Sequence, residues 1–243
     1  MKASPPPVRA HKSRRAADSA AATSTGVRGT CLTVGAAAAR SVEQVPRTPV
    51  DVAAALSAAR RDLWARTGGG LAFILAGMLL WTGLGIVGLT GADPRSAALV
   101  YLWATGLVFP LALVIGRLLG HDVLTRANPL AMLGAYLSGM QVLFFPVLLW
   151  AYLHQPSVVP WVLGTLTGAH FLPFGWLYAS RAYVVGAGLG VAVAAGTGFA
   201  FPTLTFVLTP FAMVAVFGLA ALLIVHQARR SGSHPRVADA PDL

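Results

Sequence analysis

Six long apolar blocks constrain the fold of this chain more than any other feature of its sequence. Each block is close to the ~20 residues that a helix needs to cross a hydrocarbon core of ~30 Å. Helices are expected because an open strand in lipid leaves backbone groups unpaired, and the blocks lack the alternation of barrel strands. The sequence therefore predicts an all-α integral membrane protein, a bundle of about six transmembrane helices. The expected spans cover about 70–90, 96–119, 130–153, 156–178, 182–199 and 203–225.

Composition and cysteine content exclude several other classes of protein. Of the 243 residues, 56% are hydrophobic and 11% are charged, whereas about a quarter of the residues in a soluble domain are charged. The net charge of +10 lies in tails and short loops, so we expect membrane orientation and no nucleic-acid partner. Cys31 is the only cysteine, which excludes an internal disulfide. We expect no metal ion and no cofactor.

The distribution of Lys and Arg predicts the orientation of the helices. Basic residues are retained on the cytoplasmic side of a membrane. With the amino terminus inside, the outer connections hold only Arg95, and the inner segments hold the other 17 of the 18 basic residues. This distribution requires an even number of spans. It predicts that both termini are cytoplasmic. We also expect the protein to lie in the cell (plasma) membrane.

The chain outside the spans divides into three further segments. Residues 1–50 are rich in Ala, Pro and Arg and have almost no large aliphatic side chains, which predicts a disordered basic tail. The alternative is that translation starts further downstream. Residues 51–67 predict an amphipathic helix that lies at the membrane interface, and 229–243 predict a cytoplasmic tail. The transmembrane domain is expected to cover 68–228.

Glycines and prolines within the spans predict how the helices pack and bend. Small residues four apart allow helices in lipid to approach closely, so the fourth and fifth spans are expected to pack tightly. Prolines in four spans favour kinks, which either line a cavity or shape the bundle. The glycines are Gly164, Gly168, Gly186, Gly190 and Gly198, and the prolines are Pro110, Pro146, Pro173 and Pro210.

Two polar side chains are expected near the middle of the membrane. His170 lies 11 residues before Arg181, and Gln141 lies 11 residues after Leu130, so each is about 16 Å deep at 1.5 Å per residue. Ionisable groups at this depth are costly and usually face the bundle interior, so His170 and Gln141 form the candidate polar site. The alternative is a hydrogen bond between the two helices worth about 1 kcal/mol.

Three arginines in the predicted inner connections are candidates for headgroup contacts. Arg117 and Arg126 flank the polar connection between the second and third spans, and Arg181 precedes the fifth span. Cytoplasmic arginines attract anionic lipids. For the connection of Arg117 and Arg126, the alternative interpretation is a solvated loop with a turn.

One stretch of the chain resembles a known family. The segment HFLPFGWLYASRAY at 170–183, with NPL at 128–130 and Gln141 in mid-span, resembles a family of uncharacterised bacterial multipass membrane proteins with a domain of unknown function. The resemblance covers about 60–230. It implies a multipass membrane fold and brings no established activity.

Three functional classes stay open. We favour a structural or assembly component of the membrane, with the lipid bilayer and a membrane-protein partner or a second copy as its partners. The first alternative is a small-solute permease that uses His170 and Gln141. The second is an intramembrane enzyme, which we do not expect: Ser138 and His170 superficially resemble a rhomboid protease, but the serine motif YLSG lacks its first glycine and Ala169–His170 lie on the wrong span.

Overall fold

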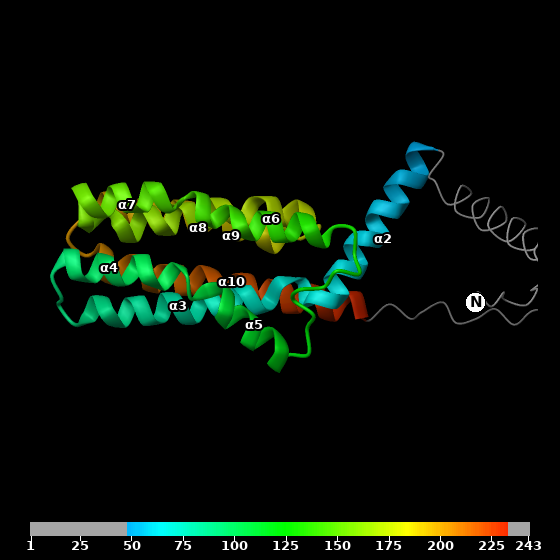
Figure 1. Ribbon diagram of the computed structural model, residues 1–243, viewed down its shortest axis with the longest axis horizontal. Helices are drawn as coiled ribbons and strands as arrows, with labels where there is room; N and C mark the ends of the chain where they lie inside the picture. Colours follow the sequence, from blue (N-terminus) through cyan, green and yellow to red (C-terminus); the bar gives the residue numbers. More distant parts are fainter. Residues whose placement is uncertain (1–47, 233–243) are drawn as a thin grey trace, which may run out of the picture. The chain divides into compact units, whose positions relative to one another are not determined.

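The computed structural model describes residues 48–232, and every regular element in this range is helical (Figure 1). Most of the predicted tail at 1–50 and the end of the chain beyond 232 lie outside the described residues. The chain divides into two units, Met1–Ala55 and Leu56–Leu243, and the helix packing below is that of the second. The elements are α2 (Pro49–Thr67), η1 (Gly68–Gly70), α3 (Leu71–Leu89), α4 (Pro94–Thr105), α5 (Val108–Leu118), α6 (Ala131–Leu143), α7 (Phe145–His154), η2 (Pro156–Val158), α8 (Val159–Leu177), α9 (Arg181–Ala200) and α10 (Thr205–Gly232).

Among the residues that the structure describes, four stretches of helix are long and apolar enough to cross a membrane. They are Pro49–Leu89, whose apolar part is α3, then Ala131–His154, Arg181–Ala200 and Thr205–Arg230. The pair α4 and α5, bent by 49°, makes a fifth if it is one broken span. Helix α8 has 19 residues and contains polar side chains, including His170, and it is not among these candidates. Over residues 48–232 the structure is thus all-helical with four or five candidate spans, and the predicted number of six is not established by length and composition.

A triple glycine separates α2 from α3. Gly68, Gly69 and Gly70 have φ angles of 61°, 62° and 78°, which lie in the left-handed region that only glycine adopts without strain. The helix expected over 51–67 therefore ends at Thr67, and the first apolar helix begins at Leu71.

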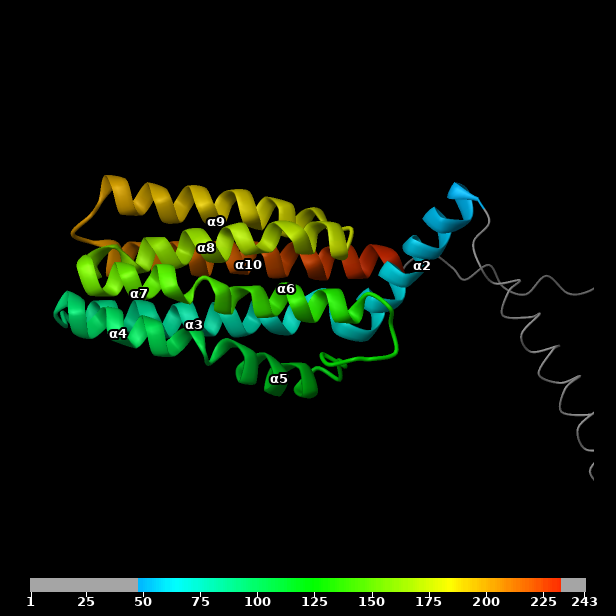
Figure 2. The same ribbon diagram turned by 45° about the horizontal axis from the view of Figure 1, so that its top comes forward.

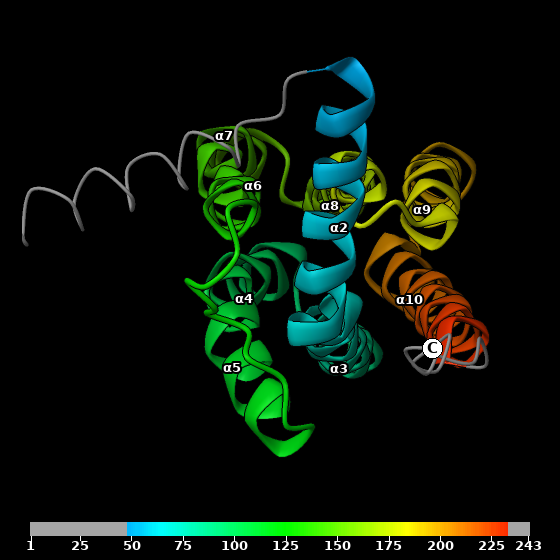
Figure 3. The ribbon, with the colours of Figure 1, turned by 90° about the vertical axis from the view of Figure 1, so that its right-hand side faces the viewer.

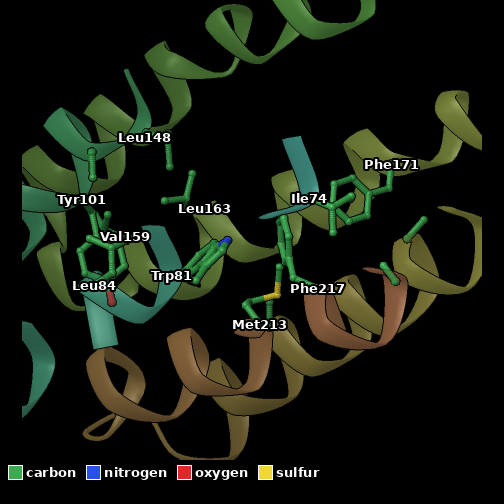
Figure 4. Packing of buried hydrophobic residues seen from close by; sticks show 14 of the residues in the cluster. Ile74, Trp81, Leu84, Tyr101, Leu148, Val159, Leu163, Phe171, Met213 and Phe217 are labelled. Carbon is green, nitrogen blue, oxygen red and sulfur yellow. The ribbon is translucent and has the colours of Figure 1, made fainter. Parts of the chain in front are cut away.

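The central helices of the Leu56–Leu243 unit are α3, α8, α9 and α10. The most extensive contacts join α8 to α9 and α10 to both α3 and α9, and these helices lie side by side in Figures 1, 2 and 3. Their buried side chains form one apolar core, part of which is shown in Figure 4. This core includes Ile74 and Trp81 of α3, Phe171 of α8, and Met213 and Phe217 of α10. Helices α4 to α7 pack around this centre.

The four prolines have two different effects on the helices. Pro110 lies near the start of α5, just after the bend from α4, and Pro146 lies in the first turn of α7, after the break at Phe144. Pro173 and Pro210 lie inside α8 and α10, which continue through them. In the first turn of a helix, the backbone N–H has no partner within the helix, so a proline there costs no hydrogen bond. Pro110 and Pro146 are therefore compatible with a new helix that begins just before them.

Candidate functional site

The contact between α8 and α9 depends on glycines. A Cβ atom at Gly168 would lie 2.6 Å from the backbone nitrogen of Val191, and one at Gly164 would lie 2.7 Å from the Cβ of Ala194. Gly190 approaches the backbone of Gly168 from the other side. The backbones of the two helices therefore approach as closely as the small-residue pattern predicts.

The remaining two glycines of this pattern accommodate aromatic rings. A Cβ at Gly186 would lie 3.1 Å from the ring of Phe171, and one at Gly198 would overlap the ring of Trp161. All five predicted packing glycines therefore lie in close contacts between α8 and α9.

The predicted polar site lies between α6 and α8. The side-chain nitrogen Nε2 of Gln141 donates to Oγ1 of Thr167 at 3.5 Å, which is long for a hydrogen bond. His170 lies one turn further along α8, and its ring meets the edge of Phe174 at a centroid distance of 5.2 Å. Within the described residues, no hydrogen bond joins Gln141 to His170. Sequence reasoning missed Thr167, because a threonine inside a helix usually bonds its own backbone.

Two buried atoms of this site have no hydrogen-bond partner in the described part of the chain. They are Oε1 of Gln141 and Nδ1 of His170. An unpaired buried polar atom costs about 1–3 kcal/mol, so such atoms usually bind an ordered water or a ligand. These two atoms, one on α6 and one on α8, are the unsatisfied polar atoms of the predicted site.

The serine considered for hydrolysis is engaged elsewhere. Oγ of Ser138 donates to the carbonyl oxygen of Gly134 at 2.9 Å, within its own helix. No bond to His170 is present among the described hydrogen bonds. The described residues also contain no group of three side chains suited to hold a metal ion.

Helices α6 and α7 are the least buried of the candidate spans. Only 6% of the most apolar stretch of Ala131–His154 is buried, against 39–44% in the three other helices of span length. Helix α6 has no buried residue at all. Tyr136, Val142 and Leu143 are 70%, 73% and 74% exposed. Sequence alone gave no sign of this, because hydropathy does not distinguish a helix that faces lipid from one that faces protein.

The connection between α5 and α6 is tied to α2 by Asn128. Its Nδ2 donates to the carbonyl oxygen of Ala59 at 2.8 Å and to Oδ2 of Asp62 at 2.7 Å. Its Oδ1 accepts from the backbone nitrogen of Leu130 at 2.8 Å. Asp62 also accepts from Nε of Arg66 at 2.9 Å, and these hydrogen bonds from Arg66 and Asn128 lower the pKa of the Asp62 carboxyl. The loop is therefore anchored at Asn128.

The three arginines expected at headgroups are all exposed. Arg117 ends α5, Arg126 lies in the α5–α6 connection, and Arg181 begins α9. The structure does not bring Arg117 or Arg126 into the polar site between α6 and α8. Their contacts with lipid stay a prediction.

Comparison with known families assigns the chain to a family. Residues 56–227, which are most of the chain and include every helix from α3 to α9, match the family of unknown function DUF7010. The chain belongs to the DUF7010 family. The predicted resemblance to a family with a domain of unknown function is thus confirmed. No curated protein and no solved structure matches this DUF7010 member.

Proposed function

We propose that the protein is a six-span membrane protein that assembles with a second copy of itself through the exposed face of α6 and α7. The observation that carries this proposal is the 6% burial of the apolar stretch in Ala131–His154. A span with so few contacts in its own chain has an unused face. In the six-span arrangement, α4 with α5 and α6 with α7 each form one broken span, and α8 is a span of its own.

Exposure to lipid alone does not require a partner, because lipid tails are as apolar as leucine. Three features of α6 favour a protein helix, and not lipid, as the neighbour of its exposed face. Ala135 and Gly139 are both exposed and four residues apart, and a Cβ at Gly139 would meet nothing within 4 Å. This small-residue spacing suits close helix approach. Tyr136, beside them, has an exposed side chain for which no hydrogen bond is described, and its hydroxyl needs a partner in a dry environment.

A second copy is the partner we propose, because symmetric dimers are by far the commonest assembly. In such a dimer the same face of α6 meets itself, so Ala135 and Gly139 of both copies come together. Placement in the cell membrane with both termini cytoplasmic is part of this proposal and is supported by the distribution of Lys and Arg.

Disulfide cross-linking in the membrane tests this dimer. In a Cys31→Ser background, we expect Leu143→Cys to form a covalent dimer on mild oxidation, because Leu143 lies on the exposed face one turn beyond Gly139. Leu222→Cys is the matched control, since Leu222 on α10 is 70% exposed against 74% for Leu143. Equal dimer formation at both positions, or none at Leu143, contradicts the proposed interface.

A small-solute permease is the second candidate function. It is supported by the two unpaired atoms, Oε1 of Gln141 and Nδ1 of His170, between α6 and α8. Uptake of small polar solutes into vesicles that contain the protein, compared with the His170→Ala variant, is the experiment for this candidate. If no solute is taken up, or if His170→Ala leaves the uptake unchanged, the permease function is contradicted.

A further inference from the structure

Arg60 of α2 has an unusual environment for a charged side chain. Its guanidinium carbon lies 4.0 Å from the centroid of a ring of Trp176, near the end of α8. Its Nε and Nη2 atoms are buried and have no hydrogen-bond partner among the described residues. The stacking contact satisfies the face of the guanidinium, but not its N–H groups, which point outward in the plane of the group.

No carboxylate of the described residues is available to Arg60. The acidic side chain nearest to it in sequence is Asp62, whose oxygens are occupied by Arg66 and Asn128. Asp62 forms its ion pair with Arg66, at 2.9 Å, and not with Arg60. A charged group whose buried N–H groups lack an acceptor is strongly destabilising, so an acceptor from outside the described chain is expected.

The surroundings of Arg60 indicate what kind of acceptor this is. Trp176 is 52% exposed, and Trp64 packs edge-on against Tyr178 at a centroid distance of 5.9 Å. Tryptophan and tyrosine gather at the level of lipid headgroups. The planar fork of an arginine matches the oxygens of a phosphate, which it binds through two parallel hydrogen bonds.

We propose that Arg60, stacked on Trp176, binds a phosphate group, and that the headgroup of an anionic phospholipid supplies it. The site is separate from the proposed α6–α7 interface and does not depend on it. The two donors that lack an acceptor, Nε and Nη2, are the ones that the phosphate oxygens would occupy.

Lipid binding to the full chain in maltoside micelles and phosphate-free buffer tests this site. Phosphatidylglycerol, phosphatidylcholine and inorganic phosphate are titrated separately, and binding is read from the rise in unfolding temperature. We expect phosphatidylglycerol to bind best, and Arg60→Gln to bind it at least about tenfold more weakly, because hydrogen bonds to a charged group are lost. Arg61→Gln is the matched control: it removes the same charge from the exposed neighbouring residue and is expected to retain the affinity.

The outcomes of this titration are distinct. Equal affinity of Arg60→Gln and the wild type, or equal losses in Arg60→Gln and Arg61→Gln, overturns the site. Stabilisation by inorganic phosphate that depends on Arg60 supports the phosphate site and assigns it to a soluble ligand, whereas stabilisation by phosphatidylglycerol alone assigns it to the lipid.

An apolar replacement tests the same site without a binding curve. In maltoside alone, Arg60→Met is expected to be at least as stable as the wild type, because it removes a charge whose buried N–H groups have no acceptor. With phosphatidylglycerol present, the wild type is expected to be more stable than Arg60→Met. If Arg60→Met is much less stable than the wild type in maltoside alone, the guanidinium has a partner within the protein and the proposal is wrong.

Discussion

Gly168→Ala is expected to destabilise the protein by about 3 kcal/mol, at the upper end of the usual cost of overpacking. The added methyl group would lie 2.6 Å from the backbone nitrogen of Val191 and 2.8 Å from the carbonyl carbon of Gly190. Backbone atoms cannot rotate away as a flexible side chain does, so α8 and α9 must separate. Because this contact is among the most extensive in the bundle, the loss is measurable as a lower midpoint of unfolding in mixed detergent micelles.

Gly188→Ala is the matched control for this prediction. Gly188 lies on the exposed side of α9, and a Cβ there would meet nothing within 4 Å. The same chemical change is therefore expected to be neutral or slightly stabilising, because alanine favours helix over glycine. Similar losses of stability at Gly168 and Gly188 would contradict the described packing of α8 on α9.

Asn128→Ala is expected to cost about 2–3 kcal/mol of stability. Asn128 is 4% exposed, and its amide makes two hydrogen bonds to α2 and a third to the backbone of Leu130 within the α5–α6 connection. Each such bond contributes about 1 kcal/mol, and the one to the Asp62 carboxylate contributes more. Detergent unfolding of the variant measures this loss, and Gln155→Ala, which truncates an exposed amide in another connection, is expected to cost almost nothing.

The same contact gives this region a pH dependence. Hydrogen bonds from Arg66 and Asn128 lower the pKa of Asp62 below its ordinary value of 3.8. A carboxyl with a lowered pKa stabilises the folded state above its unfolded pKa, and this contribution is lost as the pH falls through the folded pKa. Loss of stability below about pH 4 is therefore expected to be steeper in the wild type than in Asn128→Ala. An identical pH dependence of the two proteins contradicts the contact.

Hydropathy and glycine spacing predicted most of the helical framework. The expected spans at 70–90 and 182–199 correspond closely to α3 and α9, because an apolar stretch bounded by turn residues has few alternatives to a helix in lipid. The close approach of α8 and α9 was predictable for the same kind of reason, since glycines four apart serve few other purposes in a span.

Features that depend on contacts between distant parts of the chain were not predictable. The bond from Gln141 to Thr167 instead of His170 depends on the relative rotation of α6 and α8, which spacing along one helix does not specify. The anchoring of Asn128 depends on how the α5–α6 connection folds back to α2. The two breaks, between α4 and α5 and at Phe144, occur inside apolar stretches that hydropathy treats as continuous.

Whether α8 crosses the membrane is the most direct test of the six-span topology on which the proposed function depends. In a Cys31→Ser background, Gln155→Cys places a thiol before α8 and Ala179→Cys places one after it, and both positions are exposed. Labelling by a membrane-impermeant thiol reagent is compared in intact and permeabilised cells. We expect Gln155→Cys to react in intact cells and Ala179→Cys to react only after permeabilisation. Labelling of both positions from the same side would contradict the six-span topology.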